Sequence, residues 1–166
     1  IHVSCHPVTG WGKEYARGMR GNSHVRYDIR GEYLRLLTNM PLTYLYEERP
    51  FALTEKTYFA LTWGLGIEDD LAKVSHEFLD QTTRYWRMWV KHCSIPVLHQ
   101  EEVIRSALAL KLHCYEDTGA ILAALTTSLP EEPGGPRNWD YRYCWLRDAY
   151  FSLTAFHNLG HFEEME

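Results

Sequence analysis

The hydrophobic pattern of this sequence changes its period at Gly64-Leu65-Gly66, and this change limits the folds that the chain can adopt. Before the glycines, from Ser23 to Trp63, apolar residues recur at every second position, which is typical of strands with one buried face. After them, apolar residues recur at every third or fourth position, which is typical of amphipathic helices. We therefore expect an α+β protein in which the strands precede the helices.

Four strands are predicted before the glycines. Residues 25–29 and 34–36, on either side of Arg30-Gly31-Glu32, indicate a hairpin, residues 42–46 a third strand and residues 57–63 a fourth. The glycine-rich N-terminal segment allows only an edge strand. Together they predict an antiparallel sheet or a sandwich. The alternating residues are Val25, Tyr27, Ile29, Leu34, Leu36, Leu42, Tyr44, Tyr46, Thr57, Phe59, Leu61 and Trp63.

A long helix is predicted next, over about residues 68–92. Asp69 and Asp70 in its first turn and Lys91 in its last turn would complement the helix dipole. Pro96 then ends the helical pattern, because proline cannot continue a helix.

Two further helices are predicted, separated by a loop. The first, over residues 100–115, has few polar positions, so we expect it to be buried on more than one side, with Gly119 as its break. Residues 120–136 end in a proline- and glycine-rich run that predicts a loop. Residues 147–159 predict the last helix, with Gly160 as its C-terminal cap. Its predicted inner face consists of Ala149, Tyr150, Leu153, Phe156 and His157.

Charge and cysteine content narrow the possible functions. The formal net charge of −5 lacks the basic footprint of a nucleic-acid-binding protein, and no apolar run reaches the roughly 20 residues that span a membrane. The cysteines form no CxxC pair, so we interpret them as free thiols of a cytoplasmic protein and expect no cofactor and no metal. His2, Cys5 and His6 have ligand-like spacing, which we attribute to chance. The four cysteines are Cys5, Cys93, Cys114 and Cys144.

Residues 138–148 form the most informative motif, in which aromatic residues occupy every second position before an Arg-Asp pair. An extended backbone would place four rings on one face and three other side chains on the opposite face. The rings belong to Trp139, Tyr141, Tyr143 and Trp145, and the opposite side chains to Asp140, Arg142 and Cys144.

Such a motif suits a sugar, because a pyranose has an apolar face of C–H groups and a rim of hydroxyls. Arg147 only donates hydrogen bonds and Asp148 only accepts them, so the pair can hold a hydroxyl that does both. Periodicity alone also permits a structural interpretation. In that case the aromatic segment packs in the core, Asp148 caps the following helix and Arg147 pairs with it.

A resemblance to a known family supports the sugar interpretation. Residues 135–149, which read GPRNWDYRYCWLRDA, resemble the signature of bacterial family 15 glycoside hydrolases, and residues 118–131 resemble the segment that precedes it. Weaker similarity at residues 85–89 and 21–24 extends the resemblance over the chain.

This resemblance implies a fold and a domain organisation. Residues 1–66 would form the C-terminal part of an N-terminal β-sandwich, and residues 67–95 a linker helix. Residues 96–166 would then begin an (α/α)6 barrel, which is the catalytic domain of the family.

The same resemblance implies hydrolysis of terminal α-glucosidic bonds with inversion, as in glucoamylases and trehalases. Trp145, Arg147 and Asp148 would line the subsite for the non-reducing terminal glucose, and Tyr141 would lie near the reacting carbon. The general acid and the general base of the family lie in later barrel loops, so no catalytic residue is expected in this chain.

Nearer carboxylates are poor substitutes for that acid and base. Glu131 and Glu132 are adjacent in a loop and we expect them to be solvated, whereas inversion needs carboxyl groups about 6.5–9.5 Å apart. Asp140 and Asp148 could reach such a separation, but neither has a sequence neighbour that would raise its pKa.

We therefore expect a fragment. A twelve-helix barrel needs roughly 190 residues, more than remain after Ile95, so the remainder of the catalytic domain is an expected partner beside the α-glucoside or oligosaccharide substrate. Alone, the chain would expose apolar surface and be inactive, with poor solubility or marginal stability. The alternative is a non-catalytic carbohydrate-binding or structural module.

Overall fold

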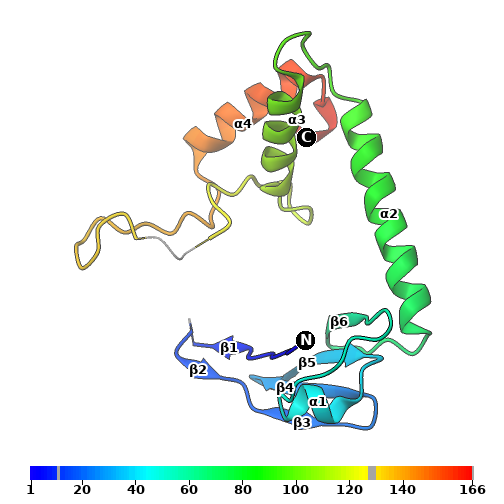
Figure 1. The fold of residues 1–166 in the computed structure, drawn as a ribbon. Helices are drawn as coiled ribbons and strands as arrows, with labels where there is room; N and C mark the ends of the chain where they lie inside the picture. Colours follow the sequence, from blue (N-terminus) through cyan, green and yellow to red (C-terminus); the bar gives the residue numbers. More distant parts are fainter. Residues whose placement is uncertain (11, 127–129, 166) are drawn as a thin grey trace. The chain divides into compact units, whose positions relative to one another are not determined.

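The computed structural model describes residues 1–10, 12–126 and 130–165, and Figure 1 shows its ribbon. The chain divides into two compact units, Ile1–Thr83 and Arg84–Glu166. The first unit contains the strands, and helix α2 (Leu71–Lys91) contributes residues to both units. The observed combination of sheets and helices confirms the predicted α+β class.

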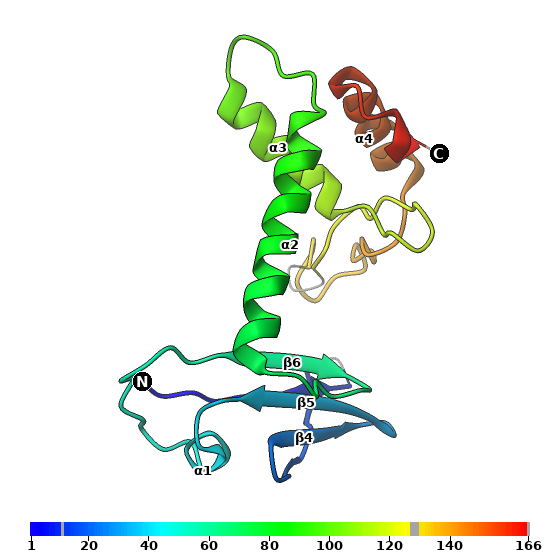
Figure 2. The same cartoon turned by 90° about the vertical axis from the view of Figure 1, so that its right-hand side faces the viewer.

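An antiparallel sheet in the order β3-β4-β5-β6 dominates the first unit (Figure 2). The predicted hairpin is confirmed, because β4 pairs with β5 through a turn in which Arg30 and Gly31 have φ of 56° and 88°. Positive φ at both positions is the conformation of a type I′ turn, which suits the twist of a hairpin. The strands are β3 (Gly18–Arg20), β4 (His24–Ile29), β5 (Glu32–Thr38) and β6 (Phe59–Trp63), with a separate pair of β1 (Val8–Thr9) and β2 (Glu14–Tyr15).

The predicted third strand is wrong, because residues 42–46 form the short helix α1 (Leu42–Tyr46). Pro41 precedes it with φ of −57°, and its carbonyl accepts a hydrogen bond from the N–H of Tyr44. Leu42 and Leu45, three positions apart, both pack against the core of the sheet. Burying these two leucines together requires a helical turn, since a strand would place them on opposite faces. The buried core consists of Val25, Tyr27, Leu36, Met40 and Leu45.

The fourth predicted strand is confirmed over Phe59–Trp63 as β6. Its larger side chains, Phe59, Leu61 and Trp63, share one face as predicted, and that face is exposed. A sandwich would require a second layer against the sheet, so the predicted β-sandwich stays a prediction.

Helix α2 confirms the predicted long helix but begins later than expected. Asp69 and Asp70 precede it instead of lying in its first turn. The Asp70 carboxylate accepts a hydrogen bond from the Lys73 N–H at 2.8 Å, so this residue caps the helix. Lys91 lies in the last turn as predicted.

The second unit is built from α3 (Gln100–Leu112), α4 (Leu146–Leu159) and the short helix η1 (Phe162–Met165), together with the end of α2. In the described chain, α3 buries only Ala107, so this helix is less buried than the sequence predicts. The core that joins these helices consists of Trp89, Ala107, Ile121, Phe156 and Leu159.

Helix α4 ends as predicted at Gly160, whose φ of 78° is the left-handed conformation of a C-terminal cap. Its inner face differs in part from the prediction. Phe156 is fully buried, whereas Tyr150 and His157 are exposed and Ser152 is buried. Within the described residues, no helix has both the length and the apolar composition needed to cross a bilayer.

Candidate functional site

The segment before α4 is a turn with short extended flanks, so the predicted extended backbone is wrong at its centre. Residues 141–142 form a turn, and the N–H of Arg142 donates to the Asp140 carboxylate at 3.0 Å. Aspartate favours such turns, because its side chain bonds the backbone two residues ahead. Cys144 forms an antiparallel bridge with Leu122, which attaches the segment to the preceding loop.

Three of the four rings of the motif contact one another despite the turn. The ring of Trp145 lies 5.5 Å from that of Tyr141, tilted by 38°, and 6.4 Å from that of Trp139, edge to face. The indole N–H of Trp145 donates to the carbonyl oxygen of Asp140 at 3.1 Å. Tyr143, the fourth ring, is 68% exposed, and the turn breaks the alternation that would have aligned it with the others.

Asp140 and Arg142 form a bidentate ion pair across the turn. The guanidinium nitrogens Nε and Nη2 of Arg142 lie 3.0 and 2.7 Å from the two carboxylate oxygens. These contacts lower the pKa of Asp140 and raise that of Arg142. A general acid needs a raised pKa, so this environment disfavours Asp140 as the acid of a glycosidase.

Arg147 and Asp148 lie in the first turn of α4 and face solvent. The Nη2 atom of Arg147 is 3.3 Å from both carboxylate oxygens of Asp148, and their side chains are 74% and 32% exposed. The pairing of the structural interpretation is therefore present, whereas the exposure of Trp139 and Tyr143 contradicts its packing of the aromatic segment in the core. The side chains of Arg147 and Asp148 are both accessible to a ligand.

Tyr141 connects the rings to the charged groups. Its hydroxyl donates to the Glu131 carboxylate at 2.9 Å, and this hydrogen bond raises the pKa of Tyr141. The charges of Arg147 and Asp148 act on the same pKa with opposite signs, so these residues are electrostatic neighbours of the phenol. Of the predicted site residues, Tyr141 and Trp145 are thus in ring contact, and Arg147 and Asp148 form a pair whose charges act on Tyr141.

Sequence reasoning missed the role of Glu131, which is exposed but bonded to Tyr141 rather than simply solvated. Glu131 and Tyr141 lie ten residues apart in a segment without a continuous helix or strand, so no periodic pattern in the sequence signals this contact. Glu132, its neighbour, instead pairs with Arg137 at 3.3 Å.

A second polar cluster, also missed from the sequence, is centred on Glu164 of η1. Its two carboxylate oxygens accept hydrogen bonds from the Trp89 indole at 2.9 Å and from Lys111 at 2.6 Å. Burial would raise the pKa of Glu164, but these hydrogen bonds outweigh burial and lower it. The Trp89 ring stacks on His161 at 4.2 Å, and His161 Nε2 lies 3.1 Å from the Cys93 sulfur. The cluster attaches η1 to α2 and α3.

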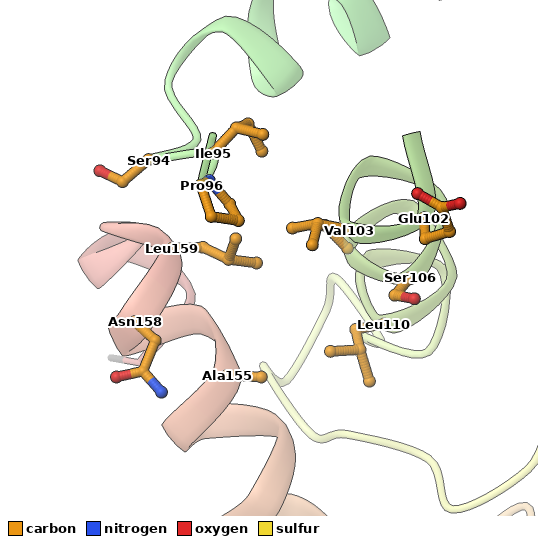
Figure 3. Close-up of a pocket in the computed structure, with 11 residues that line it drawn as sticks. Ser94, Ile95, Pro96, Glu102, Val103, Ser106, Leu110, Ala155, Asn158 and Leu159 are labelled. Atoms are coloured by element: carbon orange, nitrogen blue, oxygen red, sulfur yellow. The ribbon is translucent and has the colours of Figure 1, made fainter. Parts of the chain in front are cut away.

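An open hollow of about 650 Å³ lies between α3, α4 and the segment that follows α2 (Figure 3). Apolar side chains dominate its walls, with Val103 and Leu110 on one side and Leu159 on the other. Residues of the aromatic motif do not line this hollow, so it is separate from the site described above.

The family model for glycosyl hydrolases family 15 matches residues 97–166. This match includes residues 118–131, of which 127–129 lie outside the described residues. No solved structure matches the chain.

Similar curated proteins are trehalases. The chain is 34% identical to the trehalase of Mycobacterium tuberculosis over 96% of the chain and 25% of that protein. It is 39% identical to the trehalase of Mycolicibacterium smegmatis over 86% of the chain and 20% of that protein. It is 48% identical to the trehalase of Thermoplasma acidophilum over 52% of the chain and 15% of that protein.

The chain spans no more than about a quarter of the length of these three relatives. Residues 97–166 match the family model, and the similarity to the M. tuberculosis trehalase continues through the strand-containing unit. By its sequence, the part of the chain from residue 97 to residue 166 belongs to glycosyl hydrolase family 15.

Proposed function

We propose that this chain is part of a trehalase-like glycoside hydrolase that cleaves terminal α-glucosidic bonds with inversion. In this proposal, Tyr141, Trp145, Arg147 and Asp148 contribute part of the glucose subsite. The observation that carries the proposal is the exposed Arg147–Asp148 pair at the end of a segment whose rings are already grouped.

The chemistry of the pair suits a sugar hydroxyl. Both Arg147–Asp148 contacts are 3.3 Å long, which is longer than the 2.7–2.9 Å of a strong charge-assisted hydrogen bond. Replacing these long contacts with contacts to a sugar hydroxyl therefore costs little free energy. Each hydrogen bond between a hydroxyl and a charged group contributes about 1.5–3 kcal/mol, which is enough to orient one glucose unit.

The rings supply the apolar half of the site. Trp145 and Tyr141 lie in contact and both keep part of their surface accessible. A ring face that covers the C–H groups of a pyranose removes apolar surface from water, at about 25 cal/mol per Å². Tyr141 would lie at the reacting end of the sugar in this arrangement, next to Glu131.

The acid and base are proposed to lie outside this chain. Asp140 is held as a carboxylate by Arg142, and Glu131 is exposed and bonded to a tyrosine. The lowered pKa of Asp140 is the opposite of what the general acid of a glycosidase requires near neutral pH.

The remaining proposals concern organisation. We assign residues 1–66 to part of a β-sandwich, residues 67–95 to a linker helix and residues 96–166 to the start of an (α/α)6 catalytic domain. The remainder of that domain would be the partner of this chain. The four cysteines are free thiols, which supports a cytoplasmic location.

The test is an assay of the full-length product of the gene on α,α-trehalose and on maltose. We expect hydrolysis of one or both sugars, with β-glucose as the first product from the inverted centre. Proton NMR of the two glucose anomers measures this outcome. Retention of the α-configuration would contradict the proposed mechanism, and inactivity on both sugars would contradict the proposed substrate class.

A further inference from the structure

We propose that Asp140 is a positioning residue that fixes the contact between the rings of Tyr141 and Trp145. It acts through two groups at once, since its carboxylate holds Arg142 and its carbonyl oxygen holds the Trp145 indole. The consequence for sugar binding rests on the proposed function, whereas the geometric part does not.

The hydrogen bonds of Asp140 connect the two ends of the segment. Its carboxylate accepts three bonds from Arg142, one from the backbone N–H and two from the guanidinium, at 2.7–3.0 Å. These bonds close the turn that contains Tyr141. Its carbonyl oxygen accepts the Trp145 N–H at 3.1 Å, three residues after the turn. One residue therefore restrains both the backbone that carries the first ring and the second ring itself.

A second ion pair in the same loop provides a comparison. Glu132 and Arg137 are in contact through Nε at 3.3 Å, with side chains 38% and 66% exposed. Their pair is longer than the Asp140–Arg142 pair, and the hydrogen bonds of the Glu132 side chain among the described residues go to Arg137. A bidentate pair between residues two positions apart restricts the backbone more strongly, because both partners belong to the same turn.

The restraint matters for a sugar because ring faces bind it only when their orientation is set in advance. Each side chain that must become ordered on binding costs about 0.5–1.5 kcal/mol. Asp140 removes this cost for Trp145, whose indole N–H is already bonded before a ligand arrives. Weakening the ion pair between Asp140 and Arg142 should therefore raise KM for the sugar more than it lowers kcat.

The test compares three variants of the full-length protein: Asp140→Asn, Arg142→Lys and the matched control Glu132→Gln. Asp140→Asn removes the negative charge at nearly constant side-chain shape. Arg142→Lys keeps the positive charge but loses the bidentate geometry of the guanidinium group. The first readout is hydrogen exchange of the Trp145 indole N–H by NMR, assigned with Trp145→Phe. The Trp89 indole, bonded to Glu164, is the internal reference for intact folding.

We expect exchange at Trp145 to accelerate about tenfold in both test variants and to be unchanged in Glu132→Gln, with exchange at Trp89 unchanged in all three. We also expect KM for trehalose to rise about fivefold in the test variants with kcat within about twofold. Unchanged exchange at Trp145 in Asp140→Asn would overturn the positioning role whatever the activity. Faster exchange with unchanged KM would overturn its link to the sugar.

The two proposals fail in different ways. A wild-type protein without activity on any α-glucoside would overturn the proposed function, whereas faster Trp145 exchange in the variants would still support the positioning role. If Asp140→Asn fails to fold, as Trp89 exchange would reveal, Arg142→Lys decides the result by the same readout.

Discussion

Arg142 and Arg147 lie five residues apart, and each pairs with an aspartate one or two positions away, but the two pairs differ in geometry and exposure. Arg142 is committed to Asp140 by two guanidinium contacts of 2.7 and 3.0 Å. Arg147 makes only the longer contacts to Asp148 and is mostly exposed. The first arginine shapes the segment and the second is available to a ligand. Sequence reasoning identified Arg147 and Asp148 through a family resemblance, because spacing alone does not separate the two pairs.

Arg147→Ala and Asp148→Ala should each lower kcat/KM on an α-glucoside by at least about tenfold, because each removes a charged partner of a sugar hydroxyl. Steady-state kinetics of the full-length protein is the measurement. Arg137→Ala, at an exposed arginine in the preceding loop, is the control and should leave kcat/KM unchanged within about twofold. Unaltered kinetics in both test variants would remove these residues from the site.

At the scale of elements, the period of the hydrophobic pattern predicts the secondary structure of long segments well and that of short segments poorly. Helices α2 and α4 have many turns over which the pattern repeats, and both are found close to their predicted bounds. Helix α1 has five residues, over which alternation and a helical turn are indistinguishable. The burial of Leu42 and Leu45 decides between them, and the sequence does not reveal that burial.

The aromatic motif shows the same limit. Alternating rings predict an extended strand, but the carboxylate of Asp140 bonds the backbone of Arg142 and turns the chain instead. The sequence therefore predicts which rings belong to the proposed site, while the turn determines which of them meet. The contact of Tyr141 with Glu131 lies beyond any periodic signal.

The Lys111–Glu164 pair joins α3 to η1, and its loss should destabilise the second unit. The two side chains are only 19% and 15% exposed, so removing one partner leaves a charge in a poor environment. We expect Lys111→Met to lower the free energy of unfolding by about 1–3 kcal/mol, measured by denaturant titration. Glu77→Gln, which breaks the exposed Lys73–Glu77 pair, should change it by less than about 0.5 kcal/mol. Equal effects of both substitutions would contradict the structural role.

The same pair should make stability depend on acid pH. Hydrogen bonds outweigh burial and lower the pKa of Glu164, so its contribution is complete above the ordinary carboxyl pKa and lost as pH falls through the lowered value. The difference in unfolding free energy between the wild type and Glu164→Gln should therefore shrink below about pH 4. Urea titrations from pH 7 to pH 3 measure it, and a constant difference would contradict this assignment.

At the scale of the whole molecule, the two compact units leave large apolar side chains exposed. Leu65, Phe78, Val97 and Leu146 are each more than 70% exposed. Such exposure is what we expect if, as proposed, another part of the protein covers these side chains. The family was predictable from one motif. The catalytic acid and base were not assignable, because no part of the sequence resembles the family motifs around them.

The isolated 166-residue chain should therefore unfold over a broad temperature range, bind a hydrophobic dye before heating, and leave trehalose uncleaved above background. Calorimetry, dye fluorescence and a glucose assay measure these properties. The full-length protein, treated identically, is the comparison. A sharp cooperative transition without dye binding would contradict the expected exposure, and hydrolysis by the chain alone would contradict the proposal that the acid and the base lie outside it.

In the proposed subsite, the hydrogen bond from the Trp145 indole to Asp140 would set how this ring distinguishes one hexose from another. With its single polar atom occupied, the ring offers a ligand only carbon surface. A glucosyl unit in its chair form has equatorial hydroxyls at C2, C3 and C4 and so presents C–H hydrogens to such a surface. An epimer whose axial hydroxyl lies on the face against the ring would press an oxygen against it and lose a hydrogen bond to water, at a cost of about 1–3 kcal/mol. Stereochemical selection at this position would thus come from exclusion of an oxygen, without any polar contact from the ring.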